Sequence, residues 1–261
     1  MLIDQDTKLF FSISAKPGAL GSFLYNSAFR ELGINAIYKP LKCDSAKAFV
    51  KLVKSLKSLG AAGVSVSMPY KKEAAEICDV LSIVAECTKN VNTIRFENKE
   101  TVGYNTDYSG FIRSAYHLLE KSKSAVIYGA GAVSDSIYKG IGQQFVMHGM
   151  QDNIYIVPSD EPDLLLQLNA DLFVNATPVG MHGIEDKVFT KDVVGRYKHV
   201  FDVVIKHGHT NLIEIAKNLN KDCVSGAQMY LEQLCKQFII YTGKEPPRNL
   251  FEKLLKESGY E

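Results

Sequence analysis

The chain has 261 residues, of which 46% are hydrophobic and 23% charged, which is enough for one large domain or two modest ones with buried cores. Its formal net charge is +1 and it has no basic block, so nucleic acid and membrane surfaces are not expected partners. It lacks a signal-peptide pattern and a spanning apolar stretch. Its five cysteines are dispersed without CxxC spacing, which favours reduced thiols. We expect a soluble cytoplasmic protein.

Short strand patterns alternate with helical patterns through the first hundred residues. Strands are predicted over 8–14, 35–41 and 63–67, helices over 22–32 and 45–59, and a further helix with Pro69 as its first residue. Residues 89–107 indicate a hairpin that turns at Asn98–Lys99. Alternating strands and helices are typical of parallel βαβ units, so the pattern predicts an α/β fold.

A second alternating series follows a helix predicted at about 109–121. The stretch "SAVIYGAGAVSDS" reads as strand, glycine turn and helix. Buried strands are predicted over 153–157, 171–175 and 199–205, and helices over 226–242 and about 248–258. The sequence therefore predicts two α/β units that meet near 107–110, and a domain boundary is a preferred place for a ligand cleft.

The glycine turn suits a dinucleotide fingerprint. Gly129 allows the tight turn, and Gly131 lets a pyrophosphate approach the backbone N–H groups that open the next helix. The third glycine of GxGxxG falls at Ser134, so a plain strand-to-helix turn is an equal alternative. After the next strand, an acidic residue would favour NAD. Asp160 and Glu161 stand there without Arg or Lys, although we favour their being the first residues of the next helix.

Two charged residues stand where α/β folds place working groups. Lys71 follows a strand in "SVSMPYK", although a solvated helix position is the commoner role of a lysine. Asp107 ends a strand in "VGYNTDYSGF", where Thr106 and Asp107 are also good helix caps. The six histidines form no ligand set; His207 and His209 lack a third ligand at zinc spacing, so no metal site is expected.

Six motifs in order resemble the shikimate dehydrogenase family. They are "SVSMPYK" (65–71), "NVNT" (90–93), "GYNTDYSGF" (103–111), "GAGAV" (129–133), "NATPVGM" (175–181) and "GAQMYLEQ" (226–233). The matches span most of the chain, and "NATPVGM" and "GYNTD" are specific. The resemblance implies reduction of a 3-dehydroshikimate-like keto acid to a shikimate- or quinate-type alcohol, in aromatic amino acid biosynthesis.

The resemblance also implies roles for individual residues. Lys71 and Asp107 would be the catalytic pair, facing each other between two domains. The substrate-binding residues would be Asn92, Gln233 and Ser67, which stands for the family threonine, together with Ser65 and Ser22. The cofactor-binding residues would be Gly129, Ala130, Gly131, Ala132, Val133, Asn175, Thr177 and Gly226.

The domains and ligands follow from the same resemblance. A substrate domain would comprise residues 1–107 with 226–261, and a shortened Rossmann-like domain residues 108–225. The cofactor would be NADP, or NAD. The partner would be a small polyhydroxy acid, with no nucleic acid and no membrane, and the protein would be a monomer or homodimer.

Several positions depart from the family pattern. The two serines that hold the substrate carboxylate become Ala19 and Gly21, the asparagine of NVT becomes Ser65, and a tyrosine becomes Ile205. "VPSD" replaces the NADP-binding N-R-T motif, and the segment after Val157 is too short for the helix and strand that the family pattern has there. Three hypotheses stay open: a shikimate or quinate dehydrogenase, an enzyme for a different small hydroxy acid, or a ligand-binding relative without hydride transfer.

Overall fold

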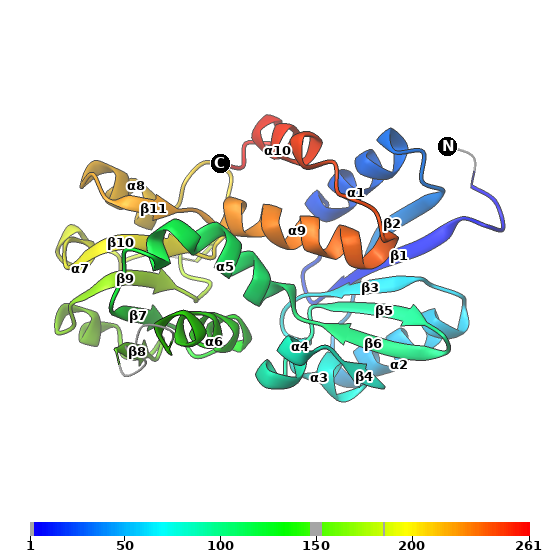
Figure 1. Ribbon diagram of the computed structural model, residues 1–261, viewed down its shortest axis with the longest axis horizontal. Coiled ribbons are helices and arrows are strands. Elements are labelled where there is room, and N and C mark those ends of the chain that lie inside the picture. Colours follow the sequence, from blue (N-terminus) through cyan, green and yellow to red (C-terminus); the bar gives the residue numbers. More distant parts are fainter. Residues whose placement is uncertain (1–2, 147–152, 185) are drawn as a thin grey trace. The chain divides into compact units, whose positions relative to one another are not determined.

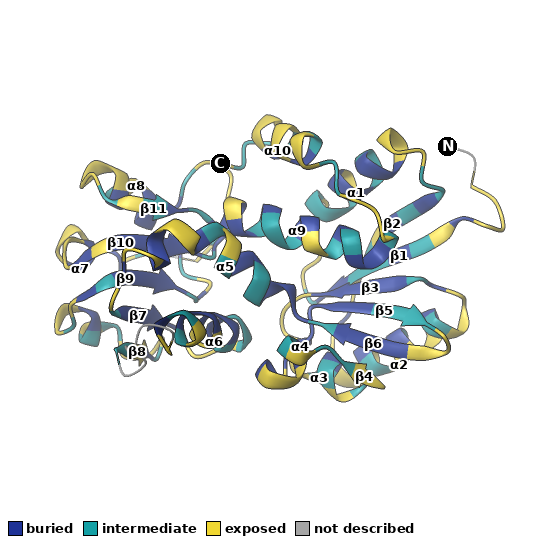
Figure 2. Cartoon of the chain, in the orientation of Figure 1, coloured by how far each residue is buried: buried dark blue, intermediate teal, exposed yellow. Residues whose placement is uncertain are grey.

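The computed structural model describes residues 3–146, 153–184 and 186–261, and they form two compact units (Figure 1). The first unit comprises Met1–Thr106 with Leu234–Phe251, and the second comprises Asp107–Gln233 with Glu252–Glu261. Each unit contains its own sheet, whose strands are largely buried (Figure 2). The predicted functional domains, 1–107 with 226–261 and 108–225, stay a prediction.

The first unit is built on a mixed six-stranded sheet of order β2-β1-β3-β5-β6-β4. Its strands are β1 (Lys8–Ser14), β2 (Ala36–Lys42), β3 (Gly63–Val66), β4 (Val80–Leu81), β5 (Thr93–Glu97) and β6 (Glu100–Tyr104). β1 runs parallel to β2 and β3, whereas β5 is antiparallel to β3 and β6. The predicted α/β class is therefore confirmed for this unit.

Four helices connect these strands, and two more contribute from the end of the chain. They are α1 (Leu20–Glu31), α2 (Ala46–Ser58), α3 (Lys71–Glu76) and α4 (Ile83–Thr88), with parts of α9 (Gly226–Thr242) and α10 (Arg248–Glu257). The prediction that Pro69 opens a helix is wrong, because α3 begins at Lys71. The backbone of Ser67 to Tyr70 forms a turn instead (Tyr70 N to Ser67 O, 3.2 Å), and the Met68 carbonyl accepts from Ala15 N (3.2 Å).

The hairpin predicted from the sequence is confirmed. β5 and β6 are joined at Asn98 and Lys99, whose φ values of +50° and +68° are those of a tight hairpin turn. The hairpin places Asn92 just before β5, and Thr106 just after β6 at the start of α5 (Thr106–Leu119). Helix α5 thus begins three residues before its predicted start, and Asp107 lies in its first turn.

The second unit is built on a parallel five-stranded sheet of order β11-β10-β9-β7-β8. Its strands are β7 (Ala125–Tyr128), β8 (Ile154–Val157), β9 (Ala170–Asn175), β10 (Tyr197–Asp202) and β11 (Asp222–Val224). This order matches the dinucleotide-binding sheet 3-2-1-4-5-6 without its third strand. Between β8 and β9 the chain has only a short 3₁₀ helix, η1 (Pro162–Leu166), as the shortness of that segment predicted.

Helices cover the faces of this parallel sheet. They are α5, α6 (Ala132–Val146), α7 (Lys191–Gly195), α8 (Asn211–Asn218) and the beginning of α9. The strand predicted over 153–157 is confirmed at Ile154–Val157, but the prediction that it is buried is wrong for most of its length, because β8 is the edge of the sheet. Tyr155 and Ile156 are 46% and 43% exposed, since no third strand lies beside them among the described residues.

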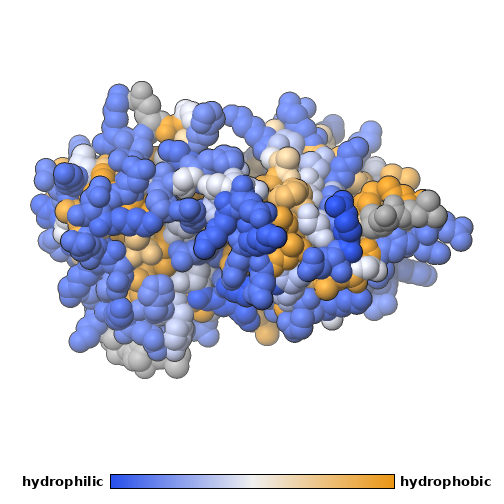
Figure 3. All heavy atoms as spheres, turned by 90° about the horizontal axis from the view of Figure 1, so that it is seen from above, coloured by the Kyte–Doolittle hydropathy of each residue, from blue (hydrophilic) through white to orange (hydrophobic). Residues whose placement is uncertain are grey.

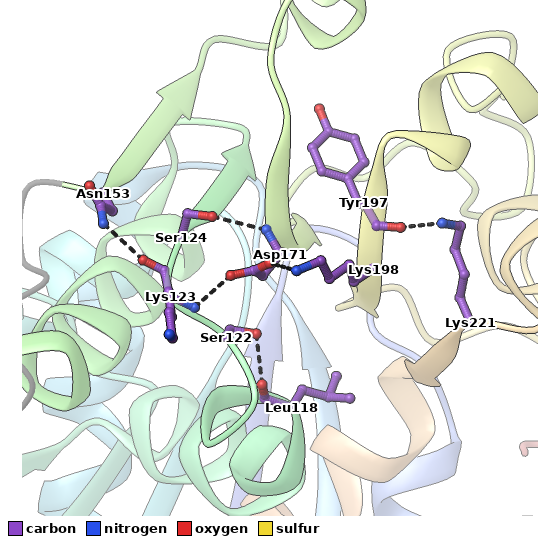
Figure 4. A network of polar contacts seen from close by, with 9 residues as sticks. All are labelled: Leu118, Ser122, Lys123, Ser124, Asn153, Asp171, Tyr197, Lys198 and Lys221. Carbon is purple, nitrogen blue, oxygen red and sulfur yellow. Dashed lines mark hydrogen bonds and ion pairs between the residues drawn. The ribbon is translucent and has the colours of Figure 1, made fainter.

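Polar contacts tie the amino ends of these strands together (Figure 4). The Asp171 carboxylate at the start of β9 accepts from the Lys123 backbone N–H (2.8 Å) and pairs with the Lys198 ammonium (2.6 Å). The Asp171 N–H donates to the Ser124 hydroxyl (3.0 Å). Ligands of parallel α/β sheets bind at the opposite, carboxyl ends, so this network has a structural role.

The surface carries no large apolar belt in the view of Figure 3, where hydrophobic side chains form separate patches on a hydrophilic face. Isolated exposed residues such as Leu59 and Ile83 are normal for a folded domain. Within the described part of the chain, no helix combines the length and the apolar character that crossing a membrane requires.

Candidate functional site

The glycine turn between β7 and α6 leaves room for a ligand. Gly129 has φ +115°, and a Cβ there would lie 2.9 Å from Thr177 Cγ2 and 3.1 Å from the Ala176 backbone, so only glycine fits. A Cβ on Gly131 would meet no atom within 4 Å. This open space borders the first turn of α6 at Ala132 and Val133, and the N-terminus of a helix attracts anions. The cradle suits the pyrophosphate of a dinucleotide.

Ser134 takes the place of the third fingerprint glycine. Its side chain is buried, and its hydroxyl donates to the Gly129 carbonyl (2.7 Å). The hydroxyl thus closes the turn from inside the helix, which explains why an incomplete fingerprint still folds as strand, turn and helix. The sequence identified the mismatch but not this contact.

A buried carboxylate organises the carboxyl ends of β9 and β10. Asn175 Oδ1 accepts from the backbone N–H and hydroxyl of Thr177 (3.0 and 2.7 Å). Asn175 Nδ2 donates to Asp202 (2.9 Å), which also accepts from the Thr210 hydroxyl (2.5 Å) and Val204 N (3.0 Å). Burial raises the pKa of Asp202 to about 6 despite these donors. Thr177 in turn lies against Gly129, so the network supports the glycine turn.

Asp107 is held by the C-terminal helix α9. Its carboxylate is 3% exposed and accepts from Gln233 Nε2 (2.9 Å). The two helices approach closely at Gly110, where a Cβ would lie 2.5 Å from Gln233 Cγ and 3.1 Å from the Met229 carbonyl. The structure therefore brings together two residues that the family resemblance assigned separately, and it identifies Gly110 as the reason they can meet.

Gly226, the first residue of α9, lies directly against the backbone that follows β10. A Cβ there would lie 2.2 Å from the Val204 carbonyl oxygen, far inside contact distance. Any side chain would push α9 away from β10. The packing gives Gly226 a structural role, and its predicted contact with a cofactor stays a prediction.

Asn92 has a fixed amide orientation in the first unit. Its Oδ1 accepts from the Thr106 backbone N–H (2.9 Å) and the Thr93 hydroxyl (2.9 Å), and its Nδ2 donates to Thr106 Oγ1 (3.0 Å). A backbone N–H can only donate, so the oxygen end of the amide is defined. Asn92 is buried and preorganised.

A directed chain of hydrogen bonds leads to Asn92 from α9. Tyr241 OH and Ser65 Oγ are 2.8 Å apart, Ser65 donates to Gln237 Oε1 (3.3 Å), and Gln237 Nε2 donates to Thr93 Oγ1 (2.8 Å). Burial raises the pKa of the neighbouring Tyr38 to about 12. Sequence reasoning missed Gln237 and Tyr241; the spacing of Gln237, four residues after Gln233 on one helix, was the available signal.

The remaining predicted residues lie near the carboxyl end of β3 and the start of α1. Lys71 is buried at the first position of α3, and its carbonyl accepts from Val91 N (2.9 Å). Ser67 is exposed two residues after Ser65, and the Ser22 hydroxyl donates to the Ala19 carbonyl (2.8 Å). Lys71 and Asp107 belong to different units, so their pairing stays a prediction. Among the described residues, no three His, Cys, Asp or Glu side chains could hold a metal ion.

Comparisons with known proteins give a uniform result. Residues 19–94 match the family model of the shikimate dehydrogenase substrate binding domain. A shikimate dehydrogenase (NADP(+)) from Methanothermobacter thermautotrophicus is 30% identical over 262 residues, covering 91% of this chain and 92% of the relative. A shikimate dehydrogenase-like protein from Haemophilus influenzae is 28% identical over 263 residues, covering 95% of this chain and 96% of the relative.

The same fold occurs in the crystal structure of shikimate dehydrogenase from Aquifex aeolicus. That structure matches with a TM-score of 0.83 and 26% identity, covering 98% of this chain and all of the other. Together with the order of motifs and the parallel sheet at the glycine turn, these matches show that the chain belongs to the shikimate dehydrogenase family of oxidoreductases.

Proposed function

We propose that the chain is an NAD(P)-dependent dehydrogenase that interconverts the ring alcohol and ketone of a shikimate-type hydroxy acid, with Lys71 and Asp107 as its catalytic pair. The observation that carries the proposal is the fixed carboxylate of Asp107, buried at the start of α5 and bonded to Gln233. Buried ionisable groups are rare unless they are paired or used. Lys71, in the first unit, is also buried.

Each of the two residues has a defined role in this reaction. Nicotinamide, when bound, supplies an acceptor or donor for the hydride. In the oxidation direction the carbinol carbon would lose hydride with its electron pair, the hydroxyl proton would pass to the neutral amine of Lys71, and the C–O single bond would become a carbonyl. Reduction reverses these transfers, with the lysine ammonium giving the proton back. The Asp107 carboxylate would hold the lysine side chain in position and balance the positive charge that Lys71 gains with the proton.

Preorganised polar groups would bind the ring hydroxyls. Asn92 has a defined amide orientation, and Gln233 is held by Asp107. Side chains that are already fixed lose little entropy when a ligand binds, so they favour one orientation of the ring. Ser67, exposed at the end of β3, would add a further hydroxyl.

Replacing Lys71 by alanine tests the proposal. Turnover of shikimate with NAD or NADP, followed by the absorbance of the reduced nicotinamide, should fall about 100- to 10,000-fold, the range typical for the loss of an acid–base group. Ligand binding should persist. Lys72→Ala is the matched control, because Lys72 is exposed on the same helix. Equal turnover by Lys71→Ala and native protein would contradict the assigned role.

A different small hydroxy acid is the second candidate substrate. Ala19 and Gly21 lack the hydroxyls that hold a carboxylate in the family, and the Ser22 hydroxyl already donates its hydrogen bond to the Ala19 carbonyl. Ser65 is bonded to Gln237 and Tyr241 instead. Serines introduced at 19 and 21 should raise shikimate affinity if the pocket has diverged, and a substrate screen with native protein distinguishes the two candidates.

A ligand-binding relative without hydride transfer is the remaining alternative. The observation that favours it is the shortened nucleotide unit, in which only η1 separates β8 from β9. Titration calorimetry with NAD and with NADP decides between the alternatives, because a relative of this kind would bind neither up to millimolar concentration. The oligomeric state of this chain, monomer or homodimer, is a separate prediction.

A further inference from the structure

Two histidines of the second unit have no role in the site described so far. His207 and His209 lie in the loop that joins β10 to α8, and among the described residues they belong to no group of three that could hold a metal ion. Both contact residues 259–261, which follow α10 and belong to the same unit. We call residues 203–210 the β10–α8 loop and residues 259–261 the strap.

The end of α10 fixes the conformation in which the strap begins. Gly259 N donates to the Lys256 carbonyl and Tyr260 N to the Leu255 carbonyl (both 2.9 Å), and Gly259 has φ +76°. These two bonds and the left-handed glycine form a Schellman motif, which ends a helix and satisfies its last carbonyls. The strap therefore leaves the helix in a defined conformation, specified by residues that are neighbours in the sequence.

The strap holds the middle of the β10–α8 loop through the backbone and through one ring. Gly208 N donates to the Gly259 carbonyl (2.8 Å), and Gly208 forms an isolated parallel β-bridge with Tyr260. The ring centroids of Tyr260 and His207 lie 4.4 Å apart, with the rings tilted by 35°. The packing is close, because a Cβ on Gly259 would lie 3.1 Å from His207 Nδ1.

Glu261 joins this loop to the next one. Its carbonyl accepts from the hydroxyl of Ser225, the residue between β11 and α9 (2.6 Å). Its carboxylate lies 3.6 Å from His209 Nε2, which accepts from the Lys217 ammonium (2.5 Å) because an ammonium can only donate. The strap therefore contacts the segments that follow two neighbouring strands, β10 and β11, at the carboxyl ends where parallel α/β sheets bind ligands.

The β10–α8 loop ends in the network around Asp202. Thr210 follows His209 directly, and its hydroxyl donates to the Asp202 carboxylate (2.5 Å). A Cβ on Gly180 would lie 3.5 Å from Thr210 Cγ2, so Thr210 also packs against the "NATPVGM" segment. The network thus holds the end of the loop, whereas the strap holds its middle.

The place of the loop in the sheet relates it to one half of a dinucleotide. A sheet of this order consists of two mononucleotide-binding halves, which meet at the strand that leads into the glycine turn. β8 lies on one side of β7, and β9, β10 and β11 lie on the other. The adenosine would bind on the β8 side. The β10–α8 loop therefore belongs to the half that would receive the nicotinamide.

We propose that the strap is a positioning element for the nicotinamide half of the dinucleotide, and that Tyr260 is its main positioning residue. Tyr260 acts through His207 and Gly208: it keeps the β10–α8 loop in the conformation that receives the nicotinamide, so that less loop entropy is lost on binding. No residue of the strap needs to touch the cofactor. The inference rests on the proposed function, since it requires a dinucleotide in the cradle at Gly131.

Titration calorimetry with the dinucleotide and with its ADP-ribose part tests the inference without any substrate. Tyr260→Ala removes the ring from His207 and should raise the dissociation constant of NAD or NADP, whichever native protein binds more tightly, about three- to tenfold. ADP-ribose, with a 2′-phosphate where NADP is preferred, lacks the nicotinamide and should bind both proteins equally. Tyr260→Phe keeps the ring and is the matched control, which should bind as native protein does.

Two further measurements separate positioning from a general loss of stability. Amide hydrogen exchange of residues 203–210 without ligand should be faster in Tyr260→Ala than in native protein, because the loop opens more often. In turnover, the KM for the dinucleotide should rise with its dissociation constant, whereas the KM for shikimate should change by less than about twofold. A variant that is only destabilised would contain less folded enzyme, which lowers the apparent kcat and leaves both KM values unchanged.

The outcomes separate this inference from the proposed function. A dissociation constant that Tyr260→Ala does not change, or an equal loss of ADP-ribose affinity, overturns the role of the strap and leaves the dehydrogenase proposal intact. Failure of folded native protein to bind either dinucleotide up to millimolar concentration overturns the proposed function, and the inference with it. If circular dichroism shows that Tyr260→Ala is unfolded, Ser225→Ala takes its place; it removes the bond to the Glu261 carbonyl and should change the same constants in the same direction.

Discussion

Gly110→Ala is a small change with a defined target. The added Cβ would lie 2.5 Å from Gln233 Cγ and 3.1 Å from the Met229 carbonyl oxygen on the facing helix α9. The first contact is impossible, and the second requires α9 to shift by a few tenths of an ångström. Because the Gln233 side chain is more mobile than the backbone, we expect it to rotate away and release Asp107.

The magnitude follows from the contacts. The lost bond from Gln233 Nε2 to Asp107 (2.9 Å) involves a carboxylate and is worth about 1.5–3 kcal/mol, a loss of roughly 10- to 150-fold in kcat/KM if it acts in the transition state. Stability also falls. Overpacking costs about 1–3 kcal/mol and the lost bond about 1.5–3 kcal/mol, whereas alanine is better than glycine inside a helix by about 1 kcal/mol. The free energy of unfolding should thus fall by about 1.5–5 kcal/mol.

A double-mutant cycle with Gln233→Ala measures whether Gly110 acts through Gln233. The truncated residue 233 leaves space for the new Cβ at position 110. In that background Gly110→Ala should change kcat/KM by no more than about twofold, because the interaction it disrupts is already absent. Steady-state turnover of the four proteins and urea unfolding of each complete the cycle.

An equal decrease of kcat/KM by Gly110→Ala in both backgrounds would contradict this prediction. That result would mean that the methyl group perturbs the start of α5 directly, or through the Met229 backbone, and that the Gln233 amide does not position Asp107. A variant that unfolds outright would be recognised by its denaturation curve, and Gln233→Ala alone would then give the value of the hydrogen bond.

Three further predictions address other parts of the site. Burial raises the pKa of Asp202 in the folded state to about 6 from an ordinary 3.8, so the folded state holds more protons than the unfolded state between these pH values. The free energy of unfolding should therefore fall by up to about 3 kcal/mol as pH rises from 3.8 to 6. Urea unfolding of Asp202→Asn should lack this decrease, and the same pH profile in both proteins would refute the prediction. Ser134→Ala removes the hydroxyl bonded to the Gly129 carbonyl, and calorimetry should show dinucleotide binding weakened severalfold, with about 1 kcal/mol lost in stability. Gln237→Leu breaks the chain to Asn92 and should raise KM by about tenfold with kcat less affected, whereas unchanged steady-state constants would exclude a positioning role.

Local signals in the sequence predicted the elements well. The hairpin turn at Asn98–Lys99, the turn at Gly129 and the helix 226–242 are specified by residues close together in the chain, and the structure confirms them. The prediction of a helix that begins at Pro69 was wrong because proline suits both the start of a helix and a turn. The contacts of the Ser67–Tyr70 turn decided in favour of the turn, and Ala15, which holds it, is far away in sequence.

The candidate site was harder to predict, because several of its residues act through distant partners. Nothing near Asp202 in the sequence indicates that Asn175 and Thr210 will donate to it. Gln237 likewise gains its importance from Thr93, which lies 144 residues earlier in the chain. A motif is recognised from residues that are neighbours in the sequence. The contacts that support its side chains come from distant residues and form only when the sheets and helices pack.

The exposed edge strand β8 has the same explanation. Its apolar residues read as a buried strand because the pattern does not reveal whether a neighbour lies beside it. Only the shortness of the segment before β9 indicated that the neighbouring strand is absent, and the exposure of Tyr155 and Ile156 follows from that absence.

Two of the departures from the family, Ala19 and Asp160, lie apart from the supporting contacts, whereas a third, Ser65, takes part in one of them. Gly110, Gly129 and Gly226 have close neighbours that only glycine allows, and these positions fix the backbone around the proposed catalytic and cofactor groups. Ala19 and Asp160 instead lie at the start of α1 and in an exposed loop, outside the core.

In this chain the backbone around the proposed catalytic groups is kept, whereas side chains proposed to contact the substrate and the cofactor are changed. We therefore expect the same type of reaction with different ligands. Substrate and cofactor preference then have to be screened together, because a test with shikimate and NADP alone combines two mismatches. On this argument the productive combination is NAD with a hydroxy acid whose carboxylate does not require the two missing serines. Activity with NADP and shikimate at full strength would show that the altered positions lie outside the ligand contacts.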